Sequence, residues 1–121
     1  MASEKGIERL RSERDFSAVY ATGKSWAAPG AVLYSKATDR SIARIGFVAG
    51  RRLGSAVQRN RAKRLLREAF REAVGWRKPP GGVDLVLVAR RRLLDLEWDQ
   101  VVGMVENLLA RGQVLEREAR E

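Results

Sequence analysis

The middle of the chain constrains the fold more than any other stretch, because it holds two strand-like runs on either side of one long helix. Residues 43–49, "ARIGFVA", have larger apolar residues at the period-two spacing of a strand with one better-buried face. Ser55 and Gln58 stand in capping-box register, and helix-forming residues continue without a break to about Val74. Residues 83–89, "VDLVLVA", are nearly all apolar, which is typical of a strand buried on both faces. Strand, helix and strand in this order predict a parallel crossover within one sheet, in an α+β or compact α/β fold.

The flanking segments add two helices and a further strand. Ser12 is placed to cap a helix that Gly23 ends, and residues 31–37, "AVLYSKA", are rich in strand formers. A last helix is expected over residues 96–110, where Trp98 and the following apolar residues form a stripe at helical spacing. A chain of 121 residues has the size of one domain. We therefore expect a single domain whose two ends are frayed.

Positive charge is concentrated in one block of the chain. The net charge is +9 and the pI is about 11.0, a balance that points to nucleic acid or an anionic membrane surface as partner. Residues 51–67 hold seven Arg or Lys side chains and no Asp or Glu. Six of the seven are Arg, which favours bidentate contacts with phosphate over mere solubility.

The helix within this block has two distinct sides at about 100° per residue. The side expected to contact the sheet is apolar and comprises Ala62, Leu65, Leu66, Ala69, Phe70 and Ala73. The side expected to face outward comprises Arg59, Asn60, Lys63, Arg64, Arg67 and Arg71, with Arg61 toward the back edge. Like charges at i, i+4 repel each other, so the repeat at 59, 63 and 67 indicates an external anion rather than a solvated face. Nucleic acid is the favoured partner, and a membrane or an acidic protein stays open.

Asn60 interrupts the basic side of the helix, where Lys or Arg would raise both helix propensity and charge. One interpretation is a hydrogen bond near the helix cap. The other is an amide that binds a base edge, a phosphate or a hydrated metal ion.

The residues on which most enzymes depend are missing. The chain has no cysteine and no histidine, which excludes thiolate metal sites and every Ser-His or Cys-His arrangement. A Mg²⁺-dependent nuclease would need converging carboxylates such as Asp84, Glu68 and Glu72, but intrahelical ion pairs with neighbours such as Arg64 explain the two glutamates more simply. We therefore expect no catalytic residue and no metal site. A DNA- or ribosomal-RNA-binding basic domain stays an alternative, although no second helix of a helix-turn-helix lies immediately upstream.

No apolar run reaches the length of a signal-peptide core or the ~20 residues of a membrane span. We therefore expect a soluble, cytoplasmic protein without membrane contact.

At "RNRAKRLLREAFR" the chain resembles the protein subunit of bacterial ribonuclease P, whose signature is an Arg-Asn-Arg motif on a helix that follows a strand. The segment "RIGFVAGRRLGSAVQRNRAKRLLREAF" is similar to the central segment of that family throughout. In addition, "ERDFSAVYATGKSW" is similar to its first helix, "VLYSK" to its next strand and "VDLVLVARR" to its last strand. The resemblance covers about residues 7–112 of one RNA-binding domain, residues 1–121.

The resemblance implies an α-β-β-β-α-β-α two-layer sandwich with a mixed four-stranded sheet, including a short strand over residues 24–27. It also implies a left-handed β-α-β crossover through the basic helix, an exception to the usual hand. Members of the family bind ribonuclease P RNA and help it remove the 5′ leader from precursor tRNA, while the RNA performs the hydrolysis. The resemblance further implies Mg²⁺ held mainly by the RNA, and a monomer in a one-to-one ribonucleoprotein.

Two RNA-binding surfaces follow from the resemblance. The first, here the RNR face, would bind the catalytic RNA and the adjoining substrate; it comprises Arg51, Arg52, Arg59, Asn60, Arg61, Lys63, Arg64 and Arg67. The second, here the aromatic surface, is implied to be a leader-binding cleft; it comprises Phe16, Tyr20, Val32 and Tyr34. Rings that stack on bases beside cations that contact phosphates suit single-stranded RNA, whereas spacing alone would place Phe16 and Tyr20 in the core. The family often has Ser-Lys-Lys where this chain has Gly50, Arg51 and Arg52, so the charge is kept and the serine hydroxyl is lost.

Overall fold

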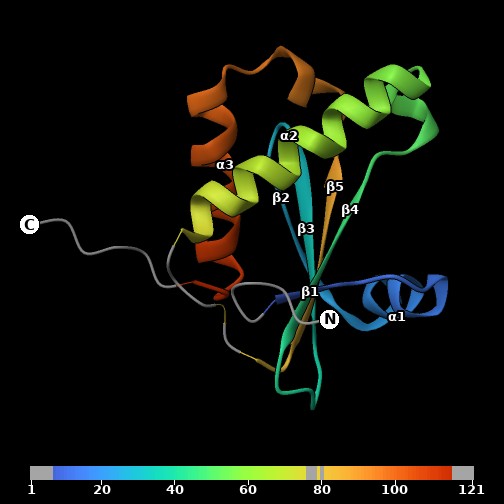
Figure 1. The fold of residues 1–121 in the computed structure, drawn as a ribbon, viewed down its shortest axis with the longest axis vertical. Coiled ribbons are helices and arrows are strands. Elements are labelled where there is room, and N and C mark those ends of the chain that lie inside the picture. The colour runs from blue at the N-terminus through green and yellow to red at the C-terminus, as the bar shows by residue number, and fades with distance from the viewer. Residues whose placement is uncertain (1–6, 76–78, 80, 116–121) are drawn as a thin grey trace, which may run out of the picture.

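The computed structural model describes residues 7–75, 79 and 81–115, apart from the side chain of Thr22. It is built around one sheet that carries helices (Figure 1). The elements in chain order are β1 (Ile7–Arg9), α1 (Glu13–Thr22), β2 (Lys24–Ala27), β3 (Ala31–Ala37), β4 (Ala43–Val48), the 3-10 helix η1 (Arg51–Leu53), α2 (Ala56–Val74), β5 (Val83–Ala89), the 3-10 helix η2 (Arg91–Asp95) and α3 (Trp98–Arg111). The frayed ends expected from the sequence lie outside the described residues. In the described part of the chain, no helix is both long and apolar enough to cross a membrane.

The sheet is mixed and has five strands in the order β1-β4-β5-β3-β2. The pairs β1/β4 and β4/β5 are parallel, whereas β2/β3 and β3/β5 are antiparallel. The predicted mixed sheet is therefore confirmed, but the prediction of four strands is wrong. The fifth strand is β1, whose three residues pair with Ala43, Arg44 and Ile45 of β4. A three-residue strand in a charged segment has too short a pattern to be recognised from sequence.

The predicted crossover is confirmed, because β4 and β5 are adjacent parallel strands joined through α2. Their hydrogen-bonded register ends at the pair Val48 and Val88, so both strands end at the same edge of the sheet. Whether the crossover is left-handed stays a prediction. The first turn of α2 has the capping box expected from Ser55 and Gln58, with both hydrogen bonds present. This cap fixes the point at which the chain leaves the sheet edge and returns across it.

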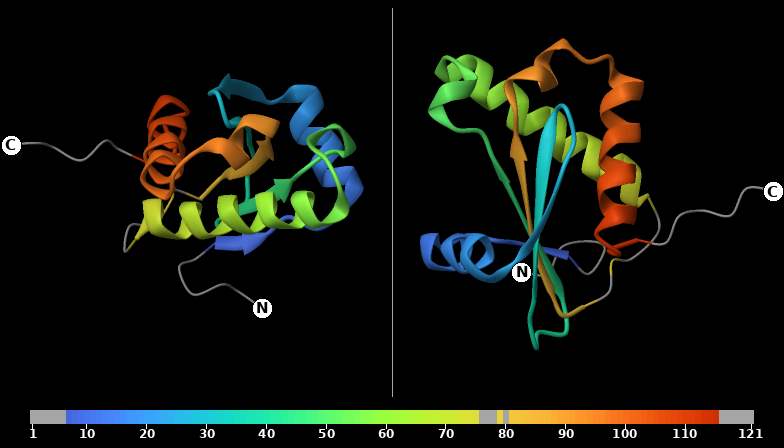
Figure 2. Two further views of the ribbon diagram at one scale, coloured as in Figure 1. Left: turned by 90° about the horizontal axis from the view of Figure 1, so that it is seen from above. Right: turned by 180° about the vertical axis from the view of Figure 1, so that it is seen from behind.

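Helices lie on both faces of the sheet (Figure 2). The odd-numbered residues of β3 and β5, such as Leu33 and Leu87, belong to a large core with α2 and α3. The even-numbered residues face the other way, where Val86 packs with Val19 of α1 in a small core. The sheet forms one layer, and α2 and α3 form a second layer on one of its faces. α1 covers part of the opposite face.

The last helix begins later than predicted. Residues 91–95 form η2, and the side chains of Glu97 and Gln100 form a capping box, so α3 starts at Trp98 rather than at residue 96. The placement of Trp98 in the apolar stripe is also wrong: its side chain is 42% exposed. The stripe itself is confirmed by Val101, Val105, Leu108 and Leu109, all of which are buried. Trp98 differs because it lies in the first turn, at the edge of the packed region.

Candidate nucleic-acid interface

The basic side of α2 is rotated relative to the prediction. Asn60, Arg61, Arg64 and Arg71 are exposed, whereas Arg59, Lys63 and Arg67 are half-buried. The reason is helical geometry: these three lie seven residues before Leu66, Phe70 and Val74, and seven residues is close to two full turns. They therefore flank the buried side. Arg61 was expected toward the back edge of the helix, near its apolar side. This expectation is wrong, because Arg61 is exposed.

Two of the half-buried arginines have contacts inside the protein. Nη1 of Arg59 donates to the backbone oxygen of Gly54 at 2.7 Å, which ties the helix to the preceding loop. The guanidinium of Arg67 lies over the ring of Phe47, 5.7 Å from its centroid, and Phe47 packs edge-on against Phe70. Nε of Arg67 is buried and has no hydrogen-bond partner within the part of the chain that the structure describes. A cation held against an aromatic ring in this way is oriented before any ligand arrives.

The exposed part of the helix is free of internal partners. Within the described residues, the ion pairs join Arg44 to Asp15 and to Asp84, so the intrahelical pairs predicted for Glu68 and Glu72 with neighbours such as Arg64 are not formed. No hydrogen bond of the Asn60 side chain is found among these residues either, which does not support its interpretation as a cap residue. Asn60, Arg61 and Arg64 thus present unshared donors to solvent.

The edge at which β4 and β5 end carries further cations. Arg51 and Arg52 of the RNR face are exposed in η1, directly after β4. Arg91 and Arg92 are exposed in η2, directly after β5, and they were not among the predicted site residues. The sequence run "ARRR" directly after a buried strand could have indicated them. Because β4 and β5 are adjacent parallel strands, residues that follow them lie at the same edge of the sheet. Arg90 has a structural contact instead, as its Nη1 donates to the oxygen of Ala28 at 3.0 Å.

The aromatic surface is partly assembled on the other face of the sheet. The rings of Tyr20 and Tyr34 meet edge-on with their centroids 5.0 Å apart, and Phe16 and Tyr34 pack against the same small core. Val32 projects from β3 on the same side as Tyr34, but it is paired with Val88 of β5 rather than packed against this core. The structure thus brings three of the four predicted residues together.

Gly46 explains how Phe16 approaches the sheet. A Cβ added to Gly46 would lie 2.5 Å from two atoms of the Phe16 ring, so the ring rests directly on the backbone of β4. Phe16 remains half-buried and Tyr20 is 41% exposed. Burial, with a smaller contribution from Tyr34, raises the pKa of the Tyr20 phenol. These rings are therefore only partly in the core, and each keeps an accessible portion.

An ion-pair network lies beside α1. Nε and Nη2 of Arg44 donate to the two oxygens of Asp84 at 2.9 and 2.7 Å, and Nη1 donates to Asp15 at 3.0 Å. These contacts, those to Asp84 first, raise the pKa of Arg44. Hydrogen bonding with Ser12, followed by the contact with Arg44, holds the pKa of Asp15 below its ordinary value.

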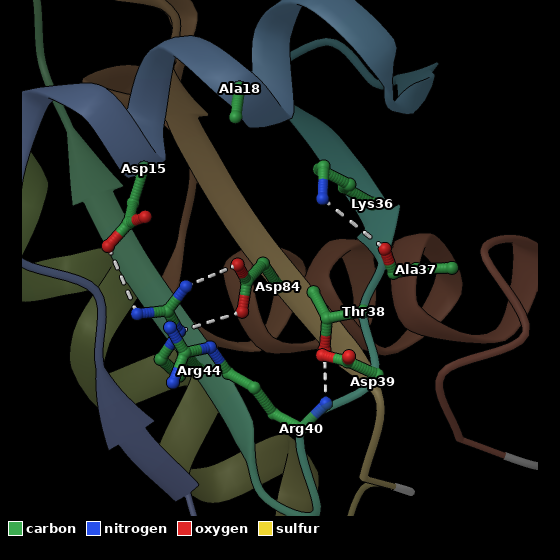
Figure 3. Close-up of a pocket in the computed structure, with 9 residues that line it drawn as sticks. All are labelled: Asp15, Ala18, Lys36, Ala37, Thr38, Asp39, Arg40, Arg44 and Asp84. Atoms are coloured by element: carbon green, nitrogen blue, oxygen red, sulfur yellow. Dashed lines mark hydrogen bonds and ion pairs between the residues drawn. The ribbon is translucent and has the colours of Figure 1, made fainter.

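The network borders a hollow of about 490 Å³ (Figure 3). The residues that line it are Asp15, Ala18, Lys36, Ala37, Thr38, Asp39, Arg40, Arg44 and Asp84. None of the four residues of the aromatic surface is among them. The hollow therefore lies on the side of α1 that carries Asp15 and Ala18, apart from the predicted leader-binding residues.

The carboxylates considered for a nuclease do not converge. Asp84 is 3% exposed and faces α1, where Arg44 occupies both of its oxygens. Glu68 and Glu72 are exposed on α2, on the opposite side of the sheet. Among the described residues, no group of three or more potential ligands could hold a metal ion. Among the described residues, the two predicted surfaces instead expose cations and parts of aromatic rings.

Comparisons with known proteins agree in sequence and in structure. The family model described as Ribonuclease P matches residues 5–113. The ribonuclease P protein component of Symbiobacterium thermophilum is 43% identical over 115 residues, covering 94% of this chain and 98% of that protein. The structure of the Staphylococcus aureus RNase P protein is similar with a TM-score of 0.76 at 29% identity, covering 88% and 95% of the two chains. That of the RNase P protein from Thermotoga maritima is similar with a TM-score of 0.73 at 34% identity, covering 86% and 96%.

The fold and the site first define a class of protein: a small α+β protein with exposed cations on one helix and at one sheet edge, an arrangement typical of proteins that bind a polyanion. The match of the family model over nearly the whole chain and the 43% identity narrow this class to one family. The chain belongs to the ribonuclease P protein family, and its function is that of a protein component of the holoenzyme that matures tRNA 5′ ends.

Proposed function

We propose that the chain divides its RNA contacts between two surfaces of the molecule. The RNR face on α2 and η1 binds ribonuclease P RNA and the adjoining precursor tRNA. The aromatic surface on α1 and β3 binds the 5′ leader. The unpaired, exposed positions Asn60, Arg61 and Arg64 support the first role, because phosphates replace their solvent with charge-assisted hydrogen bonds. The accessible rings of Phe16 and Tyr20 support the second role, since bases stack on aromatic rings.

The chemistry is assigned to the RNA. Mg²⁺ is proposed to be held mainly by that RNA, because Arg44 already forms ion pairs with the carboxylates of Asp15 and Asp84. The protein would then raise affinity for substrate and for productive Mg²⁺ rather than supply a catalytic group. A monomer bound one-to-one to the RNA, acting in the cytoplasm, completes the proposal.

One observation carries this proposal: the exposed guanidinium groups of α2 have no ion-pair partner among the described residues, where the ion pairs are those of Arg44. The test is a cleavage assay with precursor tRNA at low Mg²⁺. Rigorously RNA-free protein is expected to give no product, and the same protein added to a ribonuclease P RNA is expected to raise the cleavage rate above that of the RNA alone. Mg²⁺-dependent cleavage by the RNA-free protein would contradict the proposal, and so would a failure to stimulate the RNA.

A further inference from the structure

Arg44 on β4 forms ion pairs both with β5 of the sheet and with α1, the helix that packs on it. Each of its three guanidinium nitrogens donates to a carboxylate, Nε and Nη2 to Asp84 on β5 and Nη1 to Asp15 in the first turn of α1. The side chains of Arg44 and Asp84 are only 12% and 4% exposed, whereas that of Asp15 is 31% exposed. The buried pair thus fixes the guanidinium on the sheet, and the third nitrogen holds the helix.

The helix is attached to β4 at two successive residues. Asp15 meets Arg44, and Phe16 rests on Gly46, two residues farther along the same face of β4. One turn later in α1, Tyr20 meets Tyr34 on β3. The position of the first turn of α1 therefore bears directly on where both aromatic rings lie.

Packing alone gives α1 one firm anchor. Of the side chains of α1 that the structure describes, only Val19 is buried. Val19 anchors this ten-residue helix, and the half-buried ring of Phe16 adds a packing contact with Gly46. The ion pair at the N-terminal turn adds a polar attachment to β4 and so helps to set the direction of the helix across the sheet. Double attachment of this kind keeps binding groups in place before the ligand arrives, which lowers the cost of ordering them.

We propose that Arg44 is a positioning residue for leader binding, which through Asp15 holds α1 in the orientation that places Phe16 on β4 and Tyr20 beside β3. The inference rests on the proposed role of these two rings. The proposal gives Arg44 no direct contact with the leader, because its side chain is only 12% exposed and already donates to two carboxylates.

The sharpest test removes the contact between Arg44 and Asp15 and leaves the buried pair of Arg44 and Asp84 intact. Substitution of Arg44 would strand Asp84 as a buried, unpaired charge and would unfold much of the protein, so Asp15→Ala is the informative variant. Glu13→Ala is the matched control: Glu13 is an exposed acid in the same first turn and has no ion pair among the described residues. Both variants remove one negative charge from the helix N-terminus, and both raise the net charge equally.

Two readouts are taken from each variant. The first is the ratio of the affinities of the reconstituted holoenzyme for leader-bearing precursor and for mature tRNA. The second is the nuclear Overhauser contact between the Tyr20 and Tyr34 rings in the free protein. For Asp15→Ala we expect the affinity ratio to fall about two- to fivefold, the effect of losing a partly exposed ion pair, and the ring contact to weaken. For Glu13→Ala we expect neither to change.

A ring contact that is unchanged in Asp15→Ala would overturn the inference. So would an affinity ratio that falls equally in both variants, since that would be an effect of charge alone. If the wild-type holoenzyme does not distinguish precursor from mature tRNA, the proposed leader-binding function fails, and with it the role of Arg44 in binding. The ring contact then still shows whether Asp15 orients α1, so the two failures are distinguishable.

Discussion

The two faces of the sheet differ in how far they are covered. Among the described residues, 21 buried side chains form the core beneath α2 and α3, against three in the core beneath α1. The α1 face instead has half-buried rings, an ion-pair network and a hollow. One face thus has the apolar area that stabilises a domain of this size, and the other has groups that are still accessible to a ligand.

The same contrast holds for the helices themselves. α2 is anchored by six buried residues between Ala62 and Val74, which support its exposed cations. α1 is anchored mainly at Val19 and depends on Arg44 for its direction. The well-packed helix α2 can therefore hold charged side chains in fixed positions. The lightly covered face beneath α1 leaves parts of its aromatic rings accessible to a ligand.

The largest effect is expected from removing a side chain on the well-covered face. Leu87→Ala should lower the free energy of unfolding by about 2 to 5 kcal/mol, because it removes a fully buried leucine and leaves a cavity. Val88→Ala is the control, since Val88 is the next residue in β5, is half-buried and points to the other face. Chemical denaturation measures both; equal losses would show that the two faces contribute alike.

On the α1 face we expect a loss of binding rather than of stability. Tyr20→Ala should weaken binding of leader-bearing precursor relative to mature tRNA by about 1 to 3 kcal/mol, the value of one lost stack on a base. Stability should change little, because the ring is 41% exposed. Tyr20→Phe keeps the ring and should bind as the wild type does. Equal weakening for both tRNA forms, together with lower stability, would instead make the ring a core residue.

A single cation on α2 should have a smaller effect. Arg64→Ala should weaken binding of ribonuclease P RNA several-fold and reduce the slope of log affinity against log salt by about 1, since one phosphate contact is lost. Arg40→Ala removes the same charge from an exposed residue after β3. Titrations at several salt concentrations compare the two variants, and an unchanged slope in Arg64→Ala would argue against a phosphate contact there.

The smallest effect is expected from a substitution directly before η1. Gly50 precedes η1 with φ −79° and no side-chain cap, and a Cβ there would meet nothing within 4 Å. Gly50→Ser should therefore fit without strain and raise the free energy of unfolding by a few tenths of a kcal/mol through a new cap. Gly50→Ala lacks the hydroxyl and serves as the control. If alanine stabilises as much as serine, backbone entropy rather than capping is responsible.

Long, strongly patterned elements were predictable from the sequence, and short or edge elements were not. The cap at Ser55 and the buried β5 follow from local residues, so both were found. β1 was missed because it is ordered by pairing with β4, a contact distant in sequence. The start of α3 was misplaced because residues 91–95 take up a 3-10 turn that has no distinctive spacing.

The candidate site was predictable in its residue types but not in its orientation. The cations of α2 were identified, yet the burial of Arg59, Lys63 and Arg67 depends on how far the buried side extends toward Val74. The network around Arg44 could not be predicted, since its three members lie on three elements and carry no shared motif. Arg91 and Arg92 could have been found from the shared edge of two parallel strands.

The measurement that tests the division between the two surfaces most directly compares Tyr20→Ala and Arg64→Ala in one reconstituted holoenzyme. For each variant, the affinity for ribonuclease P RNA is measured together with the preference for precursor over mature tRNA. We predict that Tyr20→Ala loses the preference and keeps the RNA affinity, whereas Arg64→Ala loses RNA affinity and keeps the preference. If both variants lower both quantities by the same factor, the two surfaces do not act separately, and the account is contradicted.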